Sequence, residues 1–104
     1  MKTIWQFFSY NGNNIRTVKI NGEIWFVGKD VADILGYVNH YDAIVKLVDR
    51  KDKKVAQIAI PLNNRYTVST IMNEHGVDSL ISSSKLTTAK EFKHWLTSEV
   101  LQTI

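Results

Sequence analysis

The sequence predicts a small α+β domain, in which strands paired as hairpins are joined by short amphipathic helices. An Asn-Gly pair at 21–22 separates two short apolar segments, which is typical of a hairpin with a two-residue type I′ turn. Apolar residues then recur at helical spacing in 31–35 and 41–48. Strands and helices are partly segregated along the chain, which favours α+β over a doubly wound sheet. A length of 104 residues corresponds to one domain.

The expected strands form two hairpins. They are residues 17–20, 23–27, 55–60 and 65–71. Pro61 should end the third strand, and Asn63-Asn64 should supply the turn that follows it. Trp25 and Phe26 are neighbours on one strand, so their side chains should point to opposite faces of the sheet.

A pair of short helices should lie between the hairpins, in an arrangement close to a helix-turn-helix. Asp30 is the expected N-cap of the first helix, and Gly36 supplies its left-handed C-terminal residue. Asn39 is the expected N-cap of the second, with Asp42 placed to pair with Lys46. The apolar stripe expected on this second helix comprises Tyr41, Ile44, Val45 and Val48.

Two further helices are expected near the end of the chain. Val77, Leu80 and Ile81 indicate a short one. A longer amphipathic helix should bury Ala89, Phe92, Trp95, Leu96 and Val100. Thr88 and Glu91 have the spacing of a capping box at its start. Its opposite face carries Lys90, Lys93 and His94, a second candidate for phosphate contact that is also compatible with a plain solvated surface.

A basic run follows the helix pair. Residues 46–54 hold five basic and two acidic side chains, a net charge of +3, which equals that of the whole chain. The basic ones are Lys46, Arg50, Lys51, Lys53 and Lys54. Such a cluster can bind phosphates by counterion release, although a polar turn kept for solubility would have the same composition.

Several kinds of chemistry find no support in the sequence. The chain has no cysteine, which excludes disulfides, thiolate zinc sites and cysteine nucleophiles. Its histidines, His40, His75 and His94, fall in no metal-ligand spacing. Ser84-Lys85 lies in a polar connector with no sign of the desolvation that a Ser–Lys nucleophile needs. No segment approaches the roughly 18 apolar residues of a membrane-spanning helix. We therefore expect no enzyme activity, no metal, no cofactor and no membrane partner.

Five blocks of residues, in order along nearly the whole chain, carry a family resemblance. The blocks are residues 15–18 (IRTV), 25–32 (WFVGKDVA), 35–44 with Leu35-Gly36-Tyr37, Asn39 and Ala43-Ile44, 48–53 with Val48-Asp49 and Asp52-Lys53, and 84–101 with Ser84-Lys85-Leu86, Phe92-Lys93 and Trp95. By these blocks the chain resembles the BRO N-terminal domain of prophage antirepressors and DNA-virus BRO proteins. It departs from the family pattern at Leu47, where histidine is common, and at Lys51, where an acidic residue is common.

The resemblance implies a DNA-binding or regulatory domain of a phage or prophage, acting in the cytoplasm of a bacterial host. Residues 1–104 would then be the N-terminal part of a longer protein. Double-stranded DNA, bound with weak sequence specificity, is the expected partner. Lysines 46, 51, 53 and 54 with Arg50 would contact phosphate, and Asn39 and His40 at the start of the second helix would meet base edges. Tyr37 or Tyr41 could add stacking on unpaired bases.

A protein-binding module is the alternative that the sequence leaves open. In this case the basic run would meet an acidic surface of a repressor protein, as the word antirepressor implies. Alternatively the domain would form a homodimer through an exposed hairpin edge.

Overall fold

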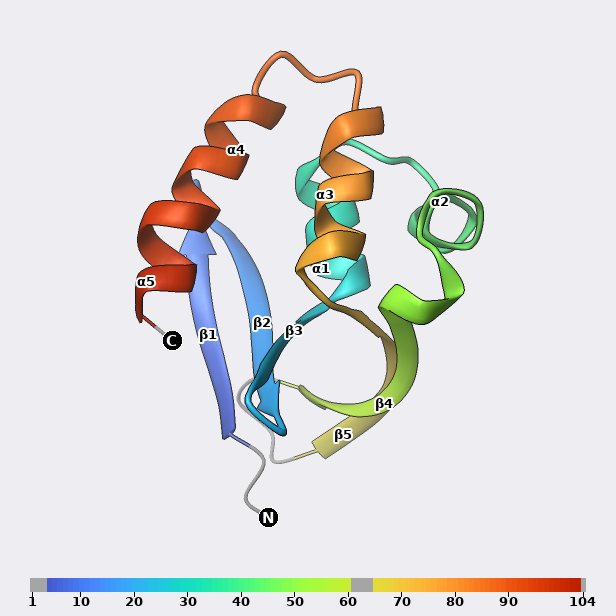
Figure 1. Cartoon of the computed structure of the whole chain (residues 1–104), viewed down its shortest axis with the longest axis vertical. Coiled ribbons are helices and arrows are strands. Elements are labelled where there is room, and N and C mark those ends of the chain that lie inside the picture. Colours follow the sequence, from blue (N-terminus) through green and yellow to red (C-terminus); the bar gives the residue numbers. More distant parts are fainter. Residues whose placement is uncertain (1–3, 61–64, 104) are drawn as a thin grey trace.

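The computed structural model describes residues 4–60 and 65–103. They form one layer of strands covered by helices, as expected for an α+β domain (Figure 1). The strands are β1 (Ile4–Tyr10), β2 (Asn13–Ile20), β3 (Glu23–Val27), β4 (Lys53–Ile60) and β5 (Arg65–Met72). Among the described residues they make a five-stranded antiparallel sheet in the order β1-β2-β3-β5-β4.

Two tight turns connect the first three strands. Asn21 and Gly22 both have positive φ, at 51° and 81°, which confirms the expected type I′ hairpin between β2 and β3. Asn11 and Gly12 have nearly the same geometry, with φ of 49° and 82°, and join β1 to β2. The first strand was not predicted from the sequence. Pro61 and the expected turn at Asn63-Asn64 lie outside the described residues.

The helical segments follow β3 and β5. They are α1 (Gly28–Ile34), α2 (His40–Leu47), the 3-10 turn η1 (Arg50–Asp52), α3 (Glu74–Ser83), α4 (Ala89–Trp95), the π-helical segment η2 (Leu96–Val100) and α5 (Leu101–Thr103). Figure 1 shows α4 and α5 beside β1 at one end of the sheet and α2 at the opposite edge, with α1 and α3 between them.

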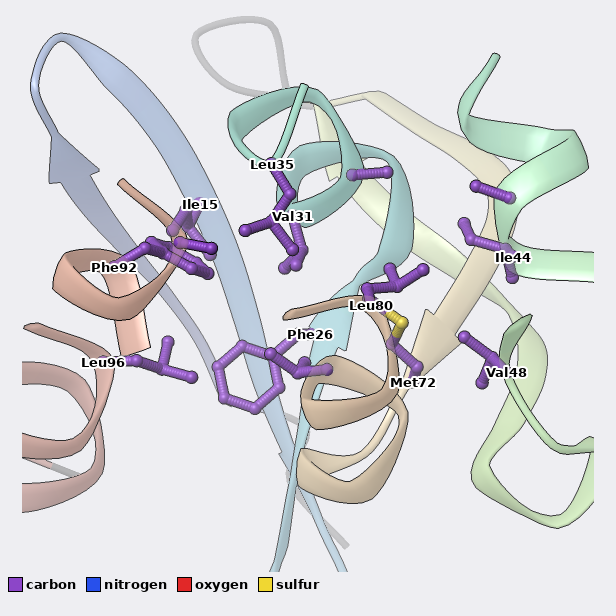
Figure 2. Packing of buried hydrophobic residues seen from close by; sticks show 14 of the residues in the cluster. Ile15, Phe26, Val31, Leu35, Ile44, Val48, Met72, Leu80, Phe92 and Leu96 are labelled. Atoms are coloured by element: carbon purple, nitrogen blue, oxygen red, sulfur yellow. The ribbon is translucent and has the colours of Figure 1, made fainter. Parts of the chain in front are cut away.

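The main core lies between the sheet and these helices. Phe26 and Met72 project from neighbouring strands β3 and β5 toward Val31, Leu80 and Leu96 of the helices (Figure 2). All five side chains are fully buried. The burial of Phe92, Leu96 and Val100 confirms the amphipathic pattern predicted for the C-terminal helix.

The opposite face of the sheet carries a smaller core made by strands alone. Trp25 of β3 packs there with Val18, Val27, Ile58 and Ile71. Because Phe26 belongs to the main core, the two neighbouring aromatics point to opposite faces, as predicted. The sheet curls strongly, so that β4 and β5 bend beneath the other strands (Figure 1).

The helix ends show which local predictions were right. Gly36 has φ of 83°, and the Asn39 side chain accepts the Asp42 backbone N–H at 3.0 Å, so both predicted signals are confirmed. Asp30 does not cap α1, because the helix begins at Gly28 and the Asp30 carboxylate instead binds Arg16. Thr88 precedes α4 without a side-chain capping bond, so the expected capping box is absent there.

Gly76 allows α3 to pack closely against the segment that joins α2 to β4. A Cβ at this position would lie 2.9 Å from Met72 Cβ, 3.0 Å from Val48 Cγ1 and 3.2 Å from the Asp52 carbonyl oxygen. We expect Gly76→Ala to lower the free energy of unfolding by about 1–3 kcal/mol, because overpacking outweighs the gain in helix propensity. Urea denaturation would measure the change.

Gly28→Ala is the matched control for this prediction. A Cβ at Gly28 would lie 3.3 Å from the Thr70 carbonyl oxygen, and its shortest contact, at 2.7 Å, would be with Cδ1 at the flexible end of the Ile44 side chain. That end can turn aside, so the loss should be clearly smaller than for Gly76→Ala. Equal losses at the two glycines would contradict the proposed close packing at Gly76.

Candidate binding surfaces around the second helix

Helix α2 is held to the domain by a narrow strip of its surface. Among its residues only Ala43 and Ile44 are buried, and Val48 follows in the core just after the helix. Tyr41 and Val45 are exposed, so half of the predicted apolar stripe was wrong. Since α2 also lies at the edge of the molecule, two of its sides are open to partners (Figure 1).

The outer side of α2 carries two of the predicted DNA-binding residues. Asn39 and Lys46 border one shallow depression together with Val38, Asp42 and Leu47. Lys46 Nζ lies 3.2 Å from Asp42 Oδ2, which confirms the predicted ion pair. This exposed pair partly neutralises Lys46 but leaves its ammonium group accessible to solvent.

The η1 turn presents Arg50 and Lys51, which are both exposed. Its geometry is fixed from beneath by Asp52, which is buried. The Asn73 side-chain amide donates to Asp52 Oδ1 at 3.2 Å, and the Asn73 backbone N–H donates to the Asp52 carbonyl at 3.0 Å. Lys51 also borders a hollow that includes Leu47, Asp49 and Asp78. Leu47 therefore connects this region with the outer side of α2.

The last two cations of the basic run point away from each other. Lys53 and Lys54 are the first residues of β4, so they lie on opposite faces of the sheet. Lys53 Nζ donates to the Ile44 carbonyl at 3.0 Å, near the C-terminal end of α2. Lys54 Nζ lies 4.3 Å from the centre of the Trp25 ring, on the face formed by strands alone. The basic run therefore does not form one continuous patch.

A cleft of about 430 Å³ separates α2 from the β4–β5 hairpin. His40 and Lys53 from the predicted set line it, together with Lys29 at the start of α1. Lys29 was missed because nothing in its spacing relates it to a helix that begins eleven residues later. His40 Nδ1 lies 3.9 Å from Asp33 Oδ1. The remaining lining is largely apolar and comes from Tyr41, Ile44, Val45, Val55 and Val68, with Ser69 and Thr70.

Other candidates from the sequence occupy separate places. Lys93, on the C-terminal helix, forms an ion pair with Asp78, whereas Lys90 and His94 are exposed. The Tyr37 hydroxyl donates to the Leu80 carbonyl at 2.7 Å, and partial burial raises the pKa of that hydroxyl above its ordinary value. Tyr37 is thus tied to α3, while Tyr41 is the more exposed of the two candidates for base stacking.

In the described ranges, no three side chains of His, Asp or Glu gather in a way that could hold a metal ion. No helix in residues 4–60 or 65–103 has the length and apolar character needed to cross a bilayer.

Comparisons with known proteins agree with the resemblance seen in the sequence. The model of the BRO family N-terminal domain, Bro-N, matches residues 14–102. The putative Bro-N domain-containing protein 289L of Invertebrate iridescent virus 6 is 33% identical over 88% of this chain and 27% of its own length. An uncharacterised Haemophilus influenzae protein is 33% identical over the whole chain and 52% of its own length. The chain therefore spans between about a quarter and a half of these relatives.

A solved structure supports the fold independently. The N-terminal domain of Orf22, a Cydia pomonella granulovirus envelope protein, superimposes with a TM-score of 0.69 at 17% identity. The match covers 99% of this chain and 100% of that domain. Since the family model matches almost the entire sequence and the fold agrees, this chain belongs to the Bro-N family, the N-terminal domain of BRO proteins.

Proposed function

We propose that this chain is a DNA-binding regulatory domain of a phage or prophage protein of the antirepressor type. The observation that carries the proposal is the open outer side of α2, which continues through Leu47 into the exposed Arg50 and Lys51 of η1. A peripheral helix followed by a basic turn suits contact with a duplex, because the helix can approach a groove while the turn meets the phosphates.

The predicted DNA-binding residues fall into two groups by their position in the structure. Lys46, Arg50 and Lys51 bind phosphate, whereas Lys53 and Lys54 are excluded because they face the cleft and Trp25. Asn39 is the base-contacting candidate on this side of the helix. Its side-chain oxygen already accepts the Asp42 backbone N–H, which leaves the amide NH₂ as its donor to a base and favours weak sequence preference.

The test is fluorescence anisotropy on a labelled random-sequence duplex over a salt series. Three phosphate contacts predict that log affinity falls with log salt at a slope of about 2.7. The double variant Arg50→Glu with Lys51→Glu should reduce that slope by about two and weaken binding at low salt by about tenfold or more. Both side chains are exposed, so the fold should be unaffected.

The matched control makes the same change in charge elsewhere. Lys19 on β2 and Lys90 on α4 are both exposed, and neither lies near α2. Lys19→Glu with Lys90→Glu should retain most of the affinity. An equal loss in both double variants would overturn the assignment of the site to η1, because either net charge alone or the Lys90 face of the C-terminal helix would then account for binding.

A protein-binding role is the second candidate, and the exposed apolar lining of the cleft is the observation that favours it. In this role the domain engages a repressor or forms a homodimer without touching DNA. Purified protein free of nucleic acid, which changes in size only when a repressor is added, would support this alternative. We also propose that the chain is the N-terminal part of a longer protein, which acts in the cytoplasm of a bacterial host.

A further inference from the structure

We infer that the cleft between α2 and the β4–β5 hairpin binds a short acidic segment of a protein partner, one that carries apolar anchor residues. The cleft lies on the side of α2 away from Asn39 and Lys46. This inference therefore goes beyond the proposed DNA contact and does not depend on it.

The cleft leaves apolar side chains exposed to water. Tyr41, Val45, Val55 and Val68 are 71%, 53%, 68% and 65% exposed, respectively. They come from both walls and surround the inner end of the cleft at Ile44, which is buried. Isolated exposed apolar residues are common, but a gathered set rimmed by polar groups is typical of a protein-binding site.

The lining of the cleft also carries positive charge. Lys29 and Lys53 line the cleft, and no Asp or Glu is among its lining residues. Lys29 makes no ion pair within the described residues. The bond from Lys53 Nζ to the Ile44 carbonyl uses one of its three protons and holds the ammonium in place. Carboxylates that flank an apolar anchor would complement these two lysines.

Two other occupants fit less well. A symmetric dimer with the clefts facing each other would gather four lysine side chains in one interface, with no carboxylate from the lining of either cleft. A DNA backbone would satisfy both lysines but would leave the valine side chains without an apolar partner. An unpaired base stacked on Tyr41 would cover only part of that surface, so single-stranded DNA serves as the competing probe.

The experiment is a selection of displayed random 12-residue peptides on the domain, followed by affinity measurements on the enriched sequences. We expect enrichment of aromatic or branched apolar residues next to Asp or Glu. Val55→Thr with Val68→Thr keeps the β-branched shape while removing apolar surface, and should weaken these peptides by about tenfold. Lys29→Glu should weaken them by about fivefold or more. Neither variant replaces a buried side chain, so folding should be retained.

Matched controls keep the outcomes distinct. Val38→Thr changes an exposed valine outside the cleft, and Lys90→Glu repeats the charge change on α4. Both should leave peptide affinity unchanged. The inference fails if no peptide is enriched, if enriched peptides are neutral or basic, or if the controls weaken binding equally. It also fails if the cleft variants abolish binding of a labelled oligo-dT strand but leave peptide binding unchanged.

Discussion

Phe26→Ala is expected to lower the free energy of unfolding by about 3–5 kcal/mol, which is a large part of the stability of a domain this size. Phe26 lies on the central strand β3, where it is opposite Thr17 of β2 and Met72 of β5. Its ring is fully buried and faces Leu80 and Leu96 from two different helices (Figure 2). Removing the ring would leave a cavity that these neighbours, fixed on separate elements, cannot close.

Phe7→Ala makes the same chemical change where it should matter little. Phe7 lies on β1, opposite Arg16, and is 50% exposed. We expect its loss to change the free energy of unfolding by no more than about 0.5–1 kcal/mol. If Phe26→Ala fails to fold, Phe26→Leu provides the measurable version, with an expected loss of about 1–2 kcal/mol. A loss for Phe26→Leu no larger than for Phe7→Ala would contradict the central position of this ring.

Much of this fold was predictable because its signals are local. The turn at Asn21-Gly22, the helix end at Gly36 and the cap at Asn39 each depend on one or two residues and their immediate backbone. The strand β1 was missed although Asn11-Gly12 carries the same turn signal. Its sequence, IWQFFSY, does not alternate between apolar and polar residues, although burial along the strand does: Phe7 is exposed whereas the flanking Gln6 and Phe8 are partly buried.

The binding surfaces were less predictable, because they depend on where strands begin and on contacts between distant residues. The sequence placed the start of the third strand at Val55, but β4 begins at Lys53. The two additional residues send Lys53 and Lys54 to opposite faces and divide the basic run. Lys29 joins His40 and Lys53 only through the packing of α1 beside the cleft, for which a single sequence offers no signal.

Asp30→Ala is the second large effect, with an expected loss of about 2–4 kcal/mol in the free energy of unfolding. One Asp30 oxygen accepts from the Arg16 backbone N–H at 3.0 Å and from Nε at 2.9 Å, and the other accepts from Nη2 at 2.8 Å. The two side chains are only 13% and 11% exposed, so solvent screens them little. The hydrogen bonds that the Arg16 guanidinium donates to Asp30 also raise the pKa of that guanidinium above its ordinary value.

The position of this pair explains why the loss should exceed that of a surface ion pair. Asp30 accepts the Arg16 backbone N–H at the point where β3 has ended and α1 has begun. Its carboxylate therefore replaces the backbone carbonyl that a longer β3 would have offered to β2. Asp42→Ala is the control, because the Asp42–Lys46 pair is exposed and should contribute only about 0.5 kcal/mol. Similar losses for Asp30→Ala and Asp42→Ala in urea denaturation would rule out this bracing role.

Two more variants separate charge from hydrogen bonding at Asp30. Asp30→Asn keeps an oxygen that can accept the Arg16 N–H, so it should lose less stability than Asp30→Ala. Asp30→Ala alone leaves the largely buried Arg16 cation without its main partner. Adding Arg16→Met removes that cation, so the double variant should lose less stability than the sum of the two single losses. Some loss should persist even then, because the backbone N–H of Arg16 would still lack its acceptor. That residual loss would identify the carboxylate as the group that fastens the helix pair to the sheet, and would distinguish this role from a simple ion pair.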